Sequence, residues 1–202
     1  MKAYTSNNIR NIAVLGHGGK GKTTLCEAML YIAGASDRLG RVADGNTVLD
    51  FDSEEKRRKS SVSSAIAALE WDNTKLNIID APGLFDFEGG AAEAVRAAEA
   101  VLIVTSAGSG VDVGTEKAFR AAEKKGAAKF FAVTKTDSDH RNFYKTFDAL
   151  KEVYGNKLCP TIIPYMEGNI TKCYVNLMTG MAFSYDENGK ATKVPVPEDS
   201  AI

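Results

Sequence analysis

The sequence predicts an α/β fold in which a mostly parallel sheet lies between two layers of helices. From residue 9 to about residue 155, short apolar runs alternate with helical patterns, and this alternation is typical of βαβ units. The chain has 202 residues, of which 44% are hydrophobic. That content is sufficient for one substantial core with a small appendage.

The expected strands are short apolar runs. They cover residues 12–16, 65–71, 76–80, 101–105 and 130–134. The expected helices carry apolar residues at spacings of three and four and end near glycine or small residues. They cover residues 23–35, 89–100, 115–126 and 141–155. The alanine-rich stretches at 91–100 and 118–128 indicate helices that pack closely against the sheet.

Two regions depart from this alternation. Residues 36–63 are polar, lack periodicity and exceed the length of a plain connection, which favours a functional or mobile loop. After residue 157 strand-like runs flank Asn188-Gly189, a pair that predicts a β-hairpin. We therefore expect one domain over residues 1–157 and part of a smaller module over residues 158–202.

Composition excludes several classes of protein. The net charge is −1, from 25 basic and 26 acidic residues, so no overall field favours direct DNA binding. No apolar run approaches a membrane span and the polar start lacks the core of a signal peptide, which predicts a cytoplasmic protein without a membrane partner. The three cysteines, Cys26, Cys159 and Cys173, lack paired spacing. We expect buried or half-buried thiols rather than a zinc site or disulfides.

The stretch "GHGGKGKTT" at residues 16–24 matches GxxxxGKT between a strand and an amphipathic helix. This is the phosphate-binding P-loop, in which glycines allow backbone N–H groups to surround phosphate oxygens. We expect Lys22 to reach the β- and γ-phosphates and Thr23 to ligate Mg²⁺. The side chains of His17 and Lys20 are interpreted as loop-filling. The predicted nucleotide-binding residues of this stretch are Gly18, Gly19, Lys20, Gly21, Lys22, Thr23 and Thr24.

The stretch "DAPGLFDF" at residues 80–87 follows the third expected strand. Asp80 is placed to hold Mg²⁺ through a water, and Gly83, after Pro82, lets its N–H approach the γ-phosphate. The next residue of such a motif often orients the attacking water. Here it is Leu84, whose side chain can neither accept a proton nor orient a water, so the sequence identifies no catalytic residue.

The stretch "TKTD" at residues 134–137 ends the fifth expected strand. The Asp137 carboxylate can accept the N1 and N2 hydrogens of guanine, whereas adenine offers no such pair of donors. Lys135 is expected along the base plane, and the Thr134 hydroxyl can bridge to the P-loop. These residues predict GTP and GDP as the ligands.

Together these stretches resemble the N-terminal GTPase domain of elongation factor G and related translational GTPases. "RNIAVLGHGGKGKTT", "LNIIDAPGLFDF" and "FFAVTKTD" are similar to that family's RNIxxxAHxDxGKTT, INIIDTPGHxDF and xxFVNKMD. "EEKRRKSSVSSAIAALEW" resembles its ERGITIxSAxxxxxW, which implies that Ser61 stands for the Mg²⁺-binding switch threonine. The family usually has Asp at Gly19, Gly at Lys59, His at Leu84 and Asn at Thr134.

The resemblance implies a P-loop NTPase (GTPase) three-layer fold, with residues 158–202 starting a small inserted α+β subdomain. It also implies that the chain is a fragment of a longer multidomain protein. The leading hypothesis is a translational GTPase that uses GTP with Mg²⁺ and, by resemblance, the ribosome as partner. The alternative is a regulatory GTP-binding module in which Leu84 has ended hydrolysis. An ATP-dependent phosphotransferase is disfavoured by Asp137.

Overall fold

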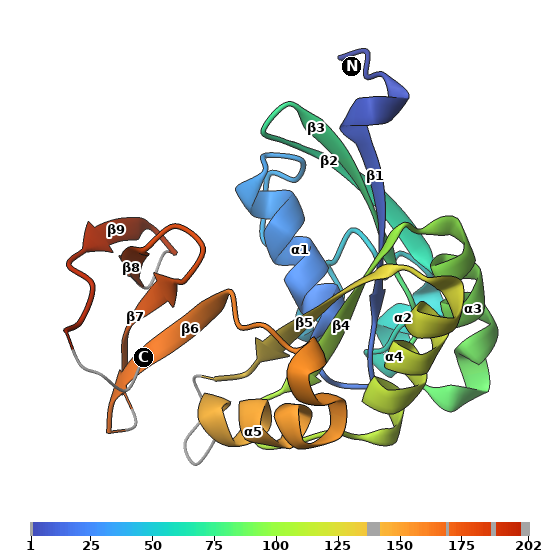
Figure 1. Ribbon diagram of the computed structural model, residues 1–202. Helices are drawn as coiled ribbons and strands as arrows, with labels where there is room; N and C mark the ends of the chain where they lie inside the picture. Colours follow the sequence, from blue (N-terminus) through green and yellow to red (C-terminus); the bar gives the residue numbers. More distant parts are fainter. Residues whose placement is uncertain (1, 137–141, 169, 187–188, 199–202) are drawn as a thin grey trace.

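The computed structural model describes residues 2–136, 142–168, 170–186 and 189–198. Its main sheet has the strand order β2-β3-β1-β4-β5 (Figure 1). These strands are β1 (Ile9–Leu15), β2 (Ala65–Trp71), β3 (Thr74–Asp80), β4 (Ala100–Ser106) and β5 (Ala128–Thr134). Neighbouring strands are parallel except for β2, which pairs antiparallel with β3. The predicted mostly parallel sheet is confirmed.

Helices cover both faces of this sheet (Figure 1). They are α1 (Lys22–Ile32), α2 (Ser53–Arg58), α3 (Glu88–Ala97), α4 (Val113–Lys125) and α5 (Phe143–Tyr154), with short 3-10 turns at Ser6–Asn8, Val42–Asp44, Phe85–Phe87 and Gly155–Lys157. Val14 packs with α1 on one face, whereas Leu15 packs with α3 and α4 on the other. This alternation follows from the period of two in a strand.

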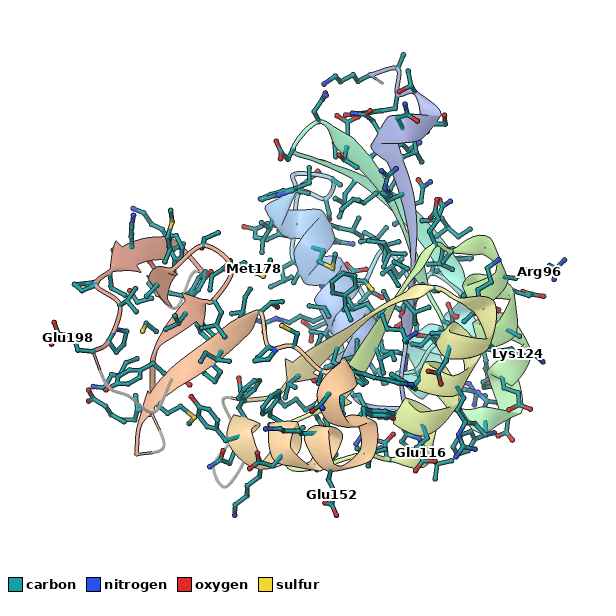
Figure 2. All side chains as sticks on the ribbon, viewed as in Figure 1. Arg96, Glu116, Lys124, Glu152, Met178 and Glu198 are labelled. Carbon is teal, nitrogen blue, oxygen red and sulfur yellow. The ribbon has the colours of Figure 1, made fainter. Side chains whose placement is uncertain are left out.

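The alanine-rich helices pack closely against the sheet, as predicted. Ala94 and Ala98 at α3 and Ala122 of α4 are buried in one cluster with residues of β1 and β4. Figure 2 shows the labelled charged side chains of α3 and α4, Arg96 and Lys124, projecting away from the sheet. Both are exposed. The described helices are amphipathic or short, and none is long and apolar enough to cross a membrane.

A second sheet follows α5. Its strands are β6 (Ile162–Glu167), β7 (Ile170–Asn176), β8 (Met181–Tyr185) and β9 (Ala191–Val194), all antiparallel and in chain order. The pairing of β8 with β9 confirms the predicted hairpin, and Asn188 of its turn lies outside the described residues. The side chain of Phe143 in α5 packs on the small core of this sheet. The Tyr144 hydroxyl donates to the Pro164 carbonyl at 2.7 Å.

The expectation for the cysteines was partly wrong. Cys26 and Cys173 are buried, but Cys159 is exposed. Cys159 lies in the connection between the 3-10 turn at Gly155–Lys157 and β6, outside both sheets. A thiol in such a connection has no core to pack against.

The long polar segment at 36–63 contains a helix that the sequence pattern did not predict. Helix α2 begins at Ser53 because Asp52 caps it, accepting a hydrogen bond from the Glu54 N–H at 2.7 Å. The Glu55 side chain in turn accepts one from the Asp52 N–H at 3.2 Å. The helix ends at Arg58, and its C-cap residue Lys59 has a left-handed φ of 55° and ψ of 39°.

Candidate nucleotide-binding site

The P-loop connects β1 to α1 at the carboxyl end of the sheet. Gly21 is the N-cap of α1 with a left-handed φ of 87°, so the loop turns sharply and the helix N-terminus faces the loop's interior. Lys22 is buried, and its Nζ donates to the His17 carbonyl at 3.1 Å. Burial lowers the pKa of Lys22, and the nearby Asp80 carboxylate opposes that shift. The Lys22 ammonium group therefore lies against the P-loop backbone, where it is expected to bind phosphate.

Residues at the end of β5 and in the β4–α4 connection hold the P-loop from outside. The Thr134 hydroxyl donates to the Lys20 carbonyl at 2.6 Å and approaches the Thr105 carbonyl at 3.1 Å. Lys135 Nζ donates to the Gly19 carbonyl at 2.7 Å. The Lys20 side chain points away from the loop's interior and pairs with Asp112 at 3.2 Å. These contacts engage carbonyl groups and the Lys20 side chain of the P-loop, and none of them uses one of its backbone N–H groups.

The three predicted metal residues lie together. The Thr23 hydroxyl donates to Asp80 Oδ2 at 2.6 Å, and its oxygen is 3.1 Å from Ser61 Oγ. The Ser61 hydroxyl donates to Asp50 Oδ1 at 2.7 Å. Because each hydroxyl hydrogen is directed to a carboxylate, the Thr23 and Ser61 oxygens face one another with free lone pairs. All four side chains are buried.

This cluster fits Mg²⁺. One oxygen of each carboxylate, Asp50 Oδ2 and Asp80 Oδ1, is buried without a hydrogen-bond partner, and burial raises the pKa of Asp80 to about 7. A divalent cation would compensate both unpartnered oxygens. The 3.1 Å between the Thr23 and Ser61 oxygens is close to the edge of about 2.9 Å in an octahedron with metal–oxygen bonds of about 2.0–2.1 Å.

The donor set also matches how Mg²⁺ is usually held. The ion is commonly bound by one or two carboxylates, hydroxyls, waters and substrate phosphates. Among the residues that the structure describes, no group of three or more His, Cys, Asp or Glu side chains could hold a metal by itself. Further ligands, such as waters or phosphates, would be needed to complete such a site.

Asp50 was missed by the sequence reasoning, and so were two buried glutamates that hold its segment. Glu27 of α1 is fully buried and its Oε1 accepts from the Val48 and Leu49 N–H groups at 2.8 and 3.0 Å. Glu55 Oε1 accepts from the Val62 N–H at 3.0 Å and from the following N–H at 3.1 Å. Each carboxylate therefore attaches one end of the stretch that carries Asp50 and Ser61.

The segment after β3 closes directly over the P-loop. A Cβ added to Gly83 would lie 2.2 Å from Lys22 Nζ and 2.8 Å from the Gly18 nitrogen, so only glycine fits there. Leu84 Cδ2 would be 2.9 Å from a Cβ on Gly18. The leucine thus covers one side of the loop with an apolar side chain, and it presents no hydrogen-bonding group there.

A cavity of about 200 Å³ gathers most of the predicted nucleotide-binding residues. Its lining includes Gly18, Gly19, Gly21, Lys22, Thr23, Thr24, Gly83 and Lys135, together with Ser61 and Asp50. Asp80 lies beneath it, bonded to Thr23. Lys20 and Thr134 support the loop from outside, Pro82 lines a neighbouring cavity, and Asp137 lies outside the described residues.

The fold and the loop geometry define a P-loop nucleotide-binding domain. A family model for the elongation factor Tu GTP-binding domain matches residues 7–202, and the chain belongs to this family. It is 33% identical over 192 residues to an elongation factor G-like protein of Mycobacterium tuberculosis, covering 95% of this chain and 26% of the relative. A similar protein of Synechocystis is 30% identical over the full chain and 30% of its own length.

Comparison with solved structures gives the same family. A crystal structure of a Thermus thermophilus protein superposes with a TM-score of 0.88 at 38% identity, covering 94% of this chain and 28% of that chain. A bacterial selenocysteine-specific elongation factor gives a TM-score of 0.60 at 25% identity over 73% of this chain and 24% of its own. The chain spans about a quarter to a third of the length of these relatives.

Proposed function

We propose that this chain is the GTP-binding domain of an elongation factor G-like translational GTPase that hydrolyses GTP slowly by itself. It would act in the cytoplasm with GTP or GDP and Mg²⁺ as ligands and the ribosome as partner. In this proposal residues 1–157 form the GTP-binding domain and residues 158–202 begin an inserted subdomain. The carrying observation is the buried cluster beneath the P-loop, in which Thr23 donates to Asp80 and its oxygen lies 3.1 Å from that of Ser61.

Each part of the site has a distinct task in this proposal. The P-loop N–H groups and Lys22 bind the phosphates, and Thr23 and Ser61 contribute metal ligands with Asp80 behind them. Bound Mg²⁺ would supply charge neutralisation between the β- and γ-phosphates. Lys135 lies over the P-loop edge beside the predicted base position, where Asp137 would accept the guanine hydrogens.

The Leu84 position favours a second candidate, a GTP-binding module with little or no hydrolysis. Its side chain borders the P-loop at Gly18 and carries no group that orients a water. Hydrolysis has other contributions, from Lys22 and the metal, and these do not depend on Leu84. We therefore place slow or ribosome-assisted turnover ahead of loss of activity.

Calorimetry with the full-length protein tests nucleotide binding. GTP and GDP should bind well above ATP, and Lys22→Ala should weaken GTP binding by about 10- to 100-fold because a charge-assisted contact is lost. Lys157→Ala is the matched control, since Lys157 pairs with Glu123 on the surface. Asp137→Asn should shift preference to xanthosine nucleotides. Equal affinity for ATP and GTP would refute the base assignment.

Single-turnover hydrolysis separates the two candidates. With ribosomes present, bound GTP should be converted to GDP by the unmodified protein. If the protein binds GTP in calorimetry but GTP is recovered intact both with and without ribosomes, the regulatory module is favoured instead.

A further inference from the structure

Lys59 ends α2 in a conformation that disfavours its own side chain. Its φ of 55° and ψ of 39° lie in the left-handed region, where a residue with a Cβ is strained and glycine is not. The resemblance to elongation factor G places a glycine at this position. Strained backbone conformations cluster at functional sites, so the strain at Lys59 points to a role for its side chain.

Lys59 lines the cavity of about 200 Å³ that gathers the predicted nucleotide-binding residues. It lines the same cavity as Lys22, Ser61 and the P-loop. Its Nζ donates to the Ala43 carbonyl in the turn at Val42–Asp44, and Val42 also lines this cavity. Lys59 therefore lines the cavity, and its ammonium group is bonded to the carbonyl of Ala43, the residue that follows the lining residue Val42.

Lys59 differs from the two arginines before it in how its positive charge is paired. Arg57 and Arg58 both pair with Glu54, at 2.6 and 2.5 Å. Within the part of the chain that the structure describes, Lys59 has no carboxylate partner. Its positive charge is therefore available for an anion in the cavity, and exchanging a carbonyl for a charged oxygen strengthens the hydrogen bond.

The position of Lys59 in the chain selects which phosphate it can meet. It stands two residues before Ser61, whose oxygen is 3.1 Å from that of Thr23 in the metal cluster. A metal held by Thr23 and Ser61 would neutralise charge on the terminal phosphates of a bound triphosphate. We propose that the Lys59 ammonium group binds the terminal phosphate of GTP, leaving the Ala43 carbonyl, and thereby favours GTP over GDP.

This inference rests on the proposed function and adds a second cation to it. Lys22 comes from the P-loop, whereas Lys59 comes from the segment between α2 and β2. A cation from that segment ties its position to the presence of the third phosphate, because GDP offers no terminal group at that place. Lys59 would thus be a phosphate-binding and specificity-determining residue.

The test measures GTP and GDP affinities of the full-length protein and three variants at Lys59 by calorimetry with Mg²⁺. Lys59→Gly removes the charge and the strain, and Lys59→Asn removes the charge but keeps a side chain that tolerates the left-handed region. Both should lower the ratio of GTP to GDP affinity by about 10- to 100-fold. Lys59→Arg should keep it, and thermal unfolding of Lys59→Gly should show no loss of stability.

Lys56→Gln is the matched control, because Lys56 is exposed on α2 and does not line the cavity; its affinity ratio should match the unmodified protein. An unchanged ratio in Lys59→Gly and Lys59→Asn, with GTP binding that still requires Lys22, refutes the Lys59 inference alone. A loss in Lys59→Gly without one in Lys59→Asn also refutes it, since backbone freedom is then the cause. If the unmodified protein binds no guanine nucleotide, both proposals are wrong.

Discussion

Replacing Glu27 with alanine should detach the segment that carries Asp50 from α1. Glu27 is fully buried, and its Oε1 is the acceptor for two backbone N–H groups, those of Val48 and Leu49, at 2.8 and 3.0 Å. Its other oxygen is buried without a partner and would lie 2.2 Å from a Cβ on Gly40. The carboxylate therefore fills the space between α1 and this segment.

The expected magnitude follows from these contacts. An unsatisfied buried backbone N–H costs about 1–3 kcal/mol, and the side chain removed also leaves a cavity. Relief of the unpartnered Oε2 offsets part of this cost. We expect Glu27→Ala to lower the free energy of unfolding by about 3 kcal/mol. Glu27→Gln keeps an oxygen for both N–H groups and should cost no more than about 1 kcal/mol.

Urea denaturation of both variants measures these values, with the urea midpoint and slope fitted together. A second measurement is the Mg²⁺ concentration required for GTP binding, which should rise in Glu27→Ala because Asp50 and, through it, Ser61 lose their attachment. Stability within about 0.5 kcal/mol of the unmodified protein in Glu27→Ala would refute this reasoning. Equal losses in the glutamine and alanine variants would show that charge, not the acceptor, holds the segment.

Three further changes have defined outcomes. Gly114→Ala should lower the free energy of unfolding by about 1–3 kcal/mol in urea denaturation, because its Cβ would lie 2.6 Å from the His17 Cα; unchanged stability would contradict that contact. A thiol reagent with peptide mapping should modify exposed Cys159 first, whereas Cys26 is buried and burial raises its pKa; equal rates would contradict this burial. Leu84→His should accelerate single-turnover GTP hydrolysis by about 10²- to 10⁴-fold only with ribosomes present, and no response under either condition would remove Leu84 from the catalytic position.

The main sheet was predictable because local pattern and tertiary packing agree there. The strand ending at Leu15 alternates between the two helical layers, and its residues from Ile12 to Leu15 form an uninterrupted apolar run. The antiparallel direction of β2 was not predicted, although Asp72 and Asn73 carried the signal. Both have a positive φ, 42° and 57°, in the two-residue connection of β2 to β3, which is typical of a hairpin turn.

Contacts between distant residues limited what could be predicted of the site. Thr23 and Asp80 stand in motifs with defined spacing, so their proximity was expected before the geometry was available. Asp50 stands in an aperiodic polar stretch, and its contact with Ser61 depends on where α2 begins and ends. Only the folded chain brings that carboxylate to the cluster.

The two buried glutamates also indicate where the segment from Val48 to Val62 would change conformation. Each holds its end through two N–H groups bonded to a charged oxygen, and such bonds are stronger than neutral ones. The contact between Thr23 and Ser61 is a neutral pair of oxygens at 3.1 Å whose hydrogens are directed elsewhere. Without a metal or a phosphate to bind both oxygens, this contact is weaker than the hydrogen bonds that Glu27 and Glu55 accept. If the proposed GTPase function holds, we expect loss of the γ-phosphate to separate Ser61 from the P-loop before it releases the ends held by Glu27 and Glu55.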